Sequence, residues 1–216
     1  MKYSNLYSTK SDSYYAESRE EILSFVPSQI QSALDIGCGK GLFGKILIEK
    51  FNCEVWGVEP DKDSAVIAGA NLDCVLNSLF DRDLDFQGKK FDCIFFNDVL
   101  EHLVDPTDAL LIANNLLKSN GCIISSIPNI LHFFTIWRII ETQDWKYEEA
   151  GIMDKTHLRF FTKKSIIRMF EECGFKVEEI QGINPTLGKK YLALNALLFN
   201  KIKDMRYRQF VVIAKR

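Results

Sequence analysis

The chain has 216 residues, of which 47% are hydrophobic and 26% are charged, and a formal net charge of −2 at pH 7. These proportions are ordinary for a globular protein, and the near-neutral charge argues against a nucleic acid as partner. The six cysteines form no CxxC pair and lie mostly in or beside apolar runs, which favours buried reduced thiols over disulfides or a metal site. The polar N-terminus lacks a signal-peptide core, and the most apolar stretch, 121–140, includes proline, asparagine, histidine and arginine. We therefore expect a reducing, cytoplasmic location without a membrane span.

Apolar periodicity predicts a helix over residues 14–26, followed by strands and helices in alternation. Alternation of this kind predicts an α/β fold of right-handed βαβ units, with ligands bound at the carboxyl ends of the strands. Several strand candidates, such as FDCIFF at 91–96, are continuously apolar, as strands buried on both faces of a parallel sheet are. The expected strands are 32–36, 54–59, 74–79, 91–96, 121–127, 175–181 and 209–214, and the expected helices are 40–50, 62–70, 105–118 and 163–173.

Two segments, 129–162 and 184–207, are longer than plain connections and carry no strand pattern. We expect them to be helical lid or substrate insertions within a single domain of residues 1–216. Aromatic side chains gather at 130–147, where Trp137 is a candidate substrate contact. Residues 189–208 mix leucines with lysines and arginines. A basic amphipathic helix there is expected to lie on a membrane surface, to cover a sheet edge or to form a homodimer, so the chain is predicted to be a monomer or a homodimer.

Residues 34–41, LDIGCGKG, predict a strand, a glycine turn and a helix. Glycines at this place allow left-handed backbone angles and let a ligand approach the main chain closely, and the helix N-terminus behind them favours a negatively charged group. Glu59 ends the next predicted strand, where an acid can accept both hydroxyls of a ribose. The pattern therefore predicts an adenosine-containing cofactor.

The identity of that cofactor is open from this loop alone. Residues 39–44 also spell GxGxxG, and Glu59 follows at the spacing typical of a dinucleotide site, which would indicate NAD. Asp35 argues against NAD, because a carboxylate beside a pyrophosphate is unfavourable, whereas near the amino group of an amino-acid ligand it is useful. A second polar motif, NDVLEHLVDP at 97–106, also has no place in a simple dinucleotide fingerprint.

The chain resembles the class I S-adenosylmethionine-dependent methyltransferases of the small UbiG-like type over about residues 14–183. The resemblance rests on the segments LDIGCGKG, VWGVEPD, FDCIFFNDVLEHLVDP, GCIISSIPN and DKTHLRFFTKKSIIRMFEECGF. It implies a Rossmann-like, seven-stranded, mostly parallel sheet with helices on both faces, and with the last strand antiparallel between the fifth and sixth. It also implies S-adenosyl-L-methionine (SAM) as methyl donor and S-adenosyl-L-homocysteine (SAH) as product.

The resemblance also implies roles for individual residues. The loop from Asp35 to Gly41 would cradle the methionine part of the cofactor, Glu59 would clamp the ribose, and aromatic residues would close over the sulfonium. Tyr14 and Tyr15 are those aromatic residues, and the competing interpretation is that they pack a helix. For Asp98 the competing interpretation is that it caps the helix after it. The residues expected to bind the cofactor are Tyr14, Tyr15, Asp35, Gly37, Cys38, Gly39, Gly41, Glu59, Pro60, Ser78, Leu79, Asn97, Asp98 and Val99.

Methyl transfer from a sulfonium is a direct displacement, so the protein must align the acceptor and, for a hydroxyl, remove its proton. His102 is our first candidate for the base and His157 the second, because histidine titrates near neutral pH. Glu101 and Asp154 are candidates to orient a histidine or to take the proton, and Arg159 is a candidate to hold an acidic group of the acceptor. The alternatives are a structural hydrogen bond for His102, and a helix cap or the orientation of Arg159 for His157. For Glu101 and Asp154 the alternative is a solvated surface acid, and for Arg159 it is a local ion pair. No metal is predicted.

We therefore expect O-methylation of a small-molecule acceptor, such as a sugar, a glycolipid or a similar metabolite, with no nucleic-acid substrate. The acceptor class rests on analogy with the family. Two alternatives remain at this point: an NAD-dependent oxidoreductase, and a non-catalytic, cofactor-binding member of the fold.

Overall fold

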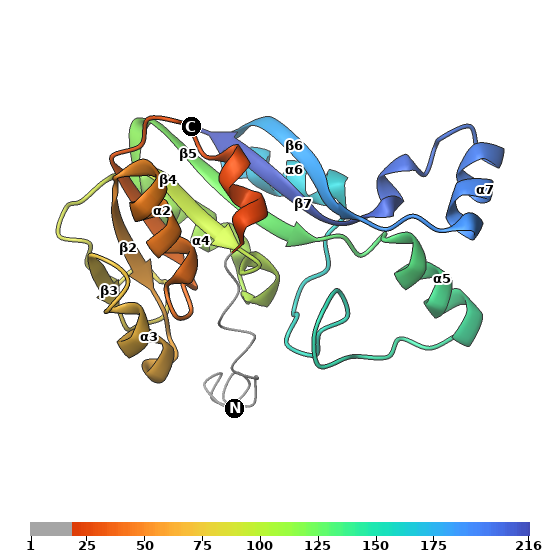
Figure 1. The fold of residues 1–216 in the computed structure, drawn as a ribbon, viewed down its shortest axis with the longest axis horizontal. Helices are drawn as coiled ribbons and strands as arrows, with labels where there is room; N and C mark the ends of the chain where they lie inside the picture. Colours follow the sequence, from red (N-terminus) through yellow and green to blue (C-terminus); the bar gives the residue numbers. More distant parts are fainter. Residues whose placement is uncertain (1–18) are drawn as a thin grey trace.

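A computed structural model describes residues 19–216, so Tyr14 and Tyr15 lie outside the described residues. The sheet has seven strands in the order β3-β2-β1-β4-β5-β7-β6 (Figure 1). Strands β1 to β5 are parallel, and β7 runs antiparallel to both β5 and β6. This confirms the predicted Rossmann-like sheet. The strands are β1 (Ser32–Ile36), β2 (Glu54–Val58), β3 (Cys74–Leu76), β4 (Phe91–Asn97), β5 (Leu117–Pro128), β6 (Lys176–Pro185) and β7 (Tyr207–Lys215).

Helices cover both faces of the sheet because successive strand residues point to opposite sides. In β4, Ile94 and Phe96 join one apolar cluster with the buried sides of α4 and α6. Their neighbours Cys93 and Phe95 join a second cluster with η2 and α2. The continuously apolar strands thus lie between two cores, as predicted. Outside the two insertions, the described helices are η2 (Glu20–Phe25), α2 (Leu42–Phe51), α3 (Lys62–Ala68), η3 (Leu100–His102), α4 (Pro106–Leu116) and α6 (Lys163–Glu172).

Several boundaries differ from the prediction for local reasons. The described part of the predicted first helix is only the short 3-10 helix η2. Strand β3 stops at Leu76 because the chain turns there, where the amide of Ser78 donates to the carbonyl of Leu76 at 3.0 Å. Strand β5 begins earlier than predicted, because Leu117 already pairs with Phe91 of β4. Residues 118–120 are polar, so an apolar pattern placed the start of the strand after them and left Leu117 in the preceding helix.

The two insertions contain α5 (Phe133–Thr142), α7 (Lys189–Leu197) and η4 (Lys203–Arg206). The helix predicted at 189–208 is therefore two short helices and a turn. Helices α5 and α7 project together beyond the end of the sheet, at the right of Figure 1. Tyr191 of α7 packs against Phe133 of α5, with ring centroids 5.4 Å apart. Within residues 19–216, no helix combines the length and apolar character needed to cross a bilayer.

Candidate active site

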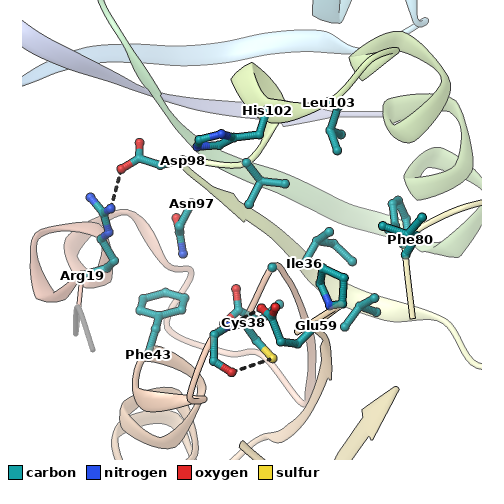
Figure 2. Close-up of a pocket in the computed structure, with 17 residues that line it drawn as sticks. Arg19, Ile36, Cys38, Phe43, Glu59, Phe80, Asn97, Asp98, His102 and Leu103 are labelled. Carbon is teal, nitrogen blue, oxygen red and sulfur yellow. Dashed lines mark hydrogen bonds and ion pairs between the residues drawn. The ribbon is translucent and has the colours of Figure 1, made fainter. Parts of the chain in front are cut away.

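A cavity opens at the carboxyl ends of β1, β2 and β4, the edge where the fold predicts a ligand (Figure 2). In the view of Figure 2, His102 and Leu103 lie on one side of it, and Cys38 and Glu59 lie on the opposite side. Gly41 and Ser78 were also predicted to bind the cofactor, but neither lines the cavity. The predicted cofactor residues that do line it are Asp35, Gly37, Cys38, Gly39, Glu59, Pro60, Leu79, Asn97, Asp98 and Val99.

The glycine loop after β1 has the left-handed backbone that its sequence predicted. Gly37, Gly39 and Gly41 have φ angles of +69°, +55° and +76°. A Cβ atom on Gly37 would lie 2.8 Å from Cγ2 of Val99, so this glycine is needed for close packing as well as for its angle. Gly41 instead packs against Ala68 of α3, which explains why it faces away from the cavity.

Glu59 connects the glycine loop to the start of α3. Its Oε2 accepts a hydrogen bond from the amide of Gly39, and its Oε1 accepts one from the amide of Asp61, both at 2.8 Å. Each carboxylate oxygen can accept a further bond, so these two contacts leave Glu59 able to receive ligand hydroxyls. Burial raises the pKa of Glu59 above its ordinary value.

Asp35 lies buried at the end of β1, beneath the same cavity. Burial, and then the charge of Glu59, raise the pKa of Asp35 to about 8. Near neutral pH this carboxyl is therefore largely protonated. A cationic group of a ligand would stabilise its ionised form, which is the environment that an ammonium group needs.

Asp98 and Asn97 form the wall of the cavity at the end of β4. Asp98 has a φ of +53° and pairs with Arg19 at 2.5 Å. It also accepts hydrogen bonds from Gln209 of β7 at 2.8 Å and from Ser126 of β5 at 3.1 Å. The helix that follows, η3, has Val99 at its N-cap and no side-chain cap bond, so Asp98 does not cap it. The amide nitrogen and oxygen of Asn97 are buried without a hydrogen-bond partner in the described chain, which leaves both for a ligand.

His102 lies at the cavity in a fixed orientation. Its Nδ1 is 3.2 Å from both the carbonyl oxygen and Oγ1 of Thr156. The carbonyl can only accept, and Oγ1 already donates to Asp154 at 2.7 Å. Nδ1 of His102 must therefore carry the proton, which leaves the lone pair of the neutral ring on Nε2. Thr156 and Asp154 thus determine which nitrogen of His102 is basic.

Glu101 and His157 lie behind His102 rather than in the cavity wall. The rings of His102 and His157 are 4.7 Å apart, and Nε2 of His157 is 3.9 Å from Oε1 of Glu101. Nδ1 of His157 faces the carbonyl of Ile152 at 3.1 Å, so it too is the donor nitrogen. The Glu101 side chain is 1% exposed, and neither of its oxygens has a hydrogen-bond partner among the described residues. Burial, with the charge of Asp98, raises the pKa of Glu101 well above its ordinary value.

Glu101, His102 and His157 are also the kind of group that can hold a metal ion. Each offers one ligand atom, and these atoms lie within 4.8 Å of one another. Both histidines present an imidazole whose other nitrogen is held by a backbone carbonyl, which is how proteins orient metal-ligating histidines. The sequence spacing did not predict this group, because His157 lies in a distant segment.

A family profile described as a methyltransferase domain matches residues 9–180 of this chain. The chain belongs to that methyltransferase-domain family. It is accordingly a class I SAM-dependent methyltransferase, as its motifs indicated, and the NAD-dependent alternative is not supported. SAM is the methyl donor of this family, and the buried acids and the unpartnered Asn97 amide fit a ligand with both cationic and hydrogen-bonding groups.

Curated relatives include the ubiquinone biosynthesis O-methyltransferases of Photobacterium profundum and Cereibacter sphaeroides. They are 23% identical to this methyltransferase over 159 residues and 28% identical over 121 residues. The alignments cover 70% and 53% of this chain, and 66% and 48% of the relatives. The chain therefore spans two thirds or less of the length of these relatives.

Solved structures show the same fold. A SAM-dependent methyltransferase from Archaeoglobus fulgidus has a TM-score of 0.63 and 20% identity, covering 95% of this chain and 94% of that one. A plantazolicin methyltransferase in complex with SAH has a TM-score of 0.65 and 15% identity, covering 94% of this chain and 88% of that one. At these identities the likeness concerns the fold.

In this methyltransferase, the two residues predicted to contact the acceptor lie away from the cavity wall. Arg159 is exposed and donates to the carbonyl of Val104 at 2.7 Å, so it holds the loop after η3. Trp137 stacks on Phe133 within the α5 insertion, with 5.9 Å between ring centroids. The cavity instead includes residues that the sequence did not single out, namely Arg19, Phe43, Phe80 and Leu103.

Proposed function

We propose that this chain methylates a hydroxyl oxygen of a small-molecule acceptor, with His102 as the general base. The observation that carries this proposal is the fixed tautomer of His102 at the cavity that the glycine loop, Glu59 and Asn97 surround. When bound, SAM supplies a methyl group already activated by its sulfonium charge. The protein's own task is then to align the acceptor and to remove one proton.

Each residue has a distinct part in this proposal. Glu59 holds the ribose hydroxyls while it fixes the glycine loop, and Asp35 holds the amino group of the methionine part in its ionised form. Asn97 offers both a donor and an acceptor at the wall of the cavity. Nε2 of His102 takes the hydroxyl proton as the new carbon–oxygen bond forms and the carbon–sulfur bond breaks. Thr156 and Asp154 keep that nitrogen deprotonated beforehand.

The proposed acceptor is a hydroxylated metabolite, for which a sugar, a glycolipid or a phenolic compound are the candidates. Support for O-methylation comes from the relatives, whose names give ubiquinone biosynthesis O-methyltransferase activity. The most direct test is a screen of hydroxylated acceptors with purified protein and SAM, measuring SAH release. Acceptor-dependent SAH release supports the proposal. Tight binding of SAM with no release for any acceptor class, including amines, would favour a non-catalytic role.

The ligand-type geometry of Glu101, His102 and His157 favours a second mechanism for the same reaction. A divalent cation held by these side chains would bind the acceptor hydroxyl and lower its pKa, in place of a histidine base. Dialysis against a chelator distinguishes the two mechanisms. Turnover that is unchanged after dialysis supports His102 as the base. Turnover that is lost on dialysis and restored by one cation supports the metal mechanism.

A further inference from the structure

Residues 187–203, which we call the α7 tip, expose an unusual amount of apolar surface. Phe199 is 87% exposed and Leu197 is 72% exposed, and Leu187 and Leu192 are more than half exposed at 59% and 52%. Isolated apolar side chains on a surface are normal, but four that are more than half exposed within one short segment favour an interaction site. Leu187 begins the tip, and Leu192, Leu197 and Phe199 lie within it.

Lysines flank this apolar surface on both sides. Lys189 and Lys190 lie between Leu187 and Leu192, Lys201 and Lys203 follow Phe199, and all four lysines are exposed. The segment between Ile180 and Lys203 contains no aspartate or glutamate. Asp204, the next acid, is occupied by Lys163 of α6 at 3.3 Å. Between Ile180 and Lys203, the charged side chains that accompany this apolar surface are therefore all lysines.

The α7 tip is held against α5 through Tyr191, whereas Leu197 and Phe199 are exposed. The buried Tyr191 packs against Phe133, and its hydroxyl donates to the carbonyl of Lys203 at 3.1 Å. Lys190 lies 4.8 Å from the centre of the Trp137 ring, which holds the start of α7 on α5. Figure 1 shows α7 at the far end of the molecule from β1 to β4, so it does not cover the sheet. The geometry leaves the leucines and Phe199 to an external partner.

We propose that the α7 tip docks on the surface of an anionic phospholipid bilayer. Leu197 and Phe199 would enter the interfacial region, and the four lysines would lie against the negatively charged headgroups. A second copy of this chain is a poorer partner, because a two-fold interface places the same patch against itself and would bring both sets of lysines together with no acid between them. The charge of the tip thus selects a negative surface.

The position of the tip relative to the cavity agrees with this orientation. Strand β5 ends at Pro128 and β7 begins beside it, with Pro128 opposite Gln209. Both insertions therefore leave the sheet at the edge that carries the cavity. A bilayer at the tip would thus meet the molecule on the cavity edge of the sheet, beyond β5 to β7, without requiring any part of the chain to cross it.

Vesicle co-sedimentation with the whole chain tests the proposal. We compare vesicles of phosphatidylcholine alone with vesicles of equal parts phosphatidylcholine and phosphatidylglycerol, at about 0.1 M and about 1 M salt, where the Debye length falls from about 10 Å to about 3 Å. We expect binding only to the vesicles that contain phosphatidylglycerol, and loss of most of it at high salt. Equal binding to both vesicle types, or binding to neither, overturns the proposal.

Two double variants test the residues. Lys201→Gln with Lys203→Gln is expected to weaken binding about fivefold per lysine, the change that about 1 kcal/mol for each basic residue gives. Leu197→Ser with Phe199→Ser is expected to remove most of the bound fraction at both salt concentrations. The matched controls are Lys62→Gln and Val66→Ser on α3, where Val66 is 71% exposed. Controls that weaken binding as much as the tip variants would overturn the assignment.

Circular dichroism and analytical ultracentrifugation complete the experiment. Unchanged circular dichroism spectra ensure that any loss of binding is not a loss of fold. The proposal would be overturned if the wild type formed a concentration-dependent dimer and did not bind vesicles, and if the Leu197→Ser, Phe199→Ser variant did not form that dimer. A second copy of the chain would then be the partner. Because only vesicle binding is measured, the result does not depend on the acceptor or on turnover.

Discussion

The carboxylate of Glu59 accepts a hydrogen bond from the backbone amide of Gly39 at 2.8 Å, across 20 positions of sequence. The contact joins the end of β2 to the glycine loop after β1. The loop is therefore held open before a ligand arrives, and the residue that we assign to the ribose is also the residue that shapes the loop.

Replacing Glu59 should weaken cofactor binding, because it removes the ribose contact and also releases the glycine loop. We expect Glu59→Ala to reduce the binding free energy of SAM by about 1–3 kcal/mol, because charged hydrogen bonds of this size are lost. Glu59→Gln should lose less, since its amide oxygen can still accept from one backbone amide. Isothermal titration calorimetry gives the dissociation constants, and the exposed Glu171→Gln serves as the control. An unchanged dissociation constant for Glu59→Ala would contradict the ribose assignment.

Asp35 should make the stability of the ligand-free protein depend on pH. Its pKa is about 8 in the folded protein, against an ordinary value of 3.8 for an aspartate, so the folded state binds a proton that the unfolded state releases between these values. The free energy of unfolding should then fall as pH rises from about 4 to about 8. Asparagine does not titrate, so Asp35→Asn lacks this pH-dependent loss of stability. We expect the variant to melt at a higher temperature than the wild type at about pH 8, with a smaller difference between the two melting temperatures at about pH 5.

The same variant should lose its response to the cofactor. The asparagine side chain cannot ionise beside an ammonium group, so SAM should raise the melting temperature of the wild type more than that of Asp35→Asn. Thermal unfolding with and without SAM at both pH values measures the two effects. A variant that is less stable than the wild type at about pH 8 would show that the buried carboxyl does not titrate as described.

His102 and Thr156 should affect turnover without affecting cofactor binding. If His102 is the base, His102→Ala should lower kcat by about 10²–10⁴-fold while the dissociation constant of SAM changes little. Thr156→Val removes the Oγ1 contact to Nδ1 and should lower kcat by a smaller factor, and Thr156→Ser should restore it. Steady-state kinetics with an active acceptor gives these values. Equal losses for the valine and serine variants would point to packing rather than to the tautomer of His102.

Gly37 and Gly88 have similar backbone angles, so alanine variants of the two distinguish the cost of the left-handed angle from the cost of a steric clash. Gly37 has a φ of +69° and a potential clash with Val99, whereas Gly88 has a φ of +73° and a Cβ added to it would meet nothing within 4 Å. Both alanine variants should lose about 1–2 kcal/mol of stability from the left-handed angle. Gly37→Ala should lose more, and should also weaken SAM binding, because Val99 lines the cavity. Chemical denaturation compares the two variants, and equal losses would mean that Val99 moves aside at little cost.

The sheet and the glycine loop could be predicted because their causes are local. Continuous apolar runs specify strands buried on both faces, and Gly37, Gly39 and Gly41 specify a backbone that other residues rarely adopt. The wall of the cavity around Asp98 depends instead on contacts between residues that are distant in the sequence. Arg19 meets Asp98 only after the sheet has formed, and no pattern around either residue indicates the pairing.

The tip insertion shows a second limit of sequence patterns. Apolar and basic residues at 189–208 predicted one amphipathic helix, but the chain forms a helix, a turn and η4. Phe199 and Asn200 have positive φ angles, so the chain turns after α7. Neither residue is a glycine, so the sequence did not predict a turn there. The role of Arg159 was obscured in the same way, because its partner is a backbone carbonyl, which no side-chain pattern reveals.

The order β5-β7-β6 has a consequence for synthesis of the chain. Among the described strands, β6 pairs only with β7, so it must wait, already translated, until the residues of β7 emerge from the ribosome. The same late strand carries Gln209, which steadies Asp98 at the cavity. A nascent chain that stalls just before Tyr207 would therefore leave β6 unpaired and β5 without its second neighbour, together with an unfinished binding wall.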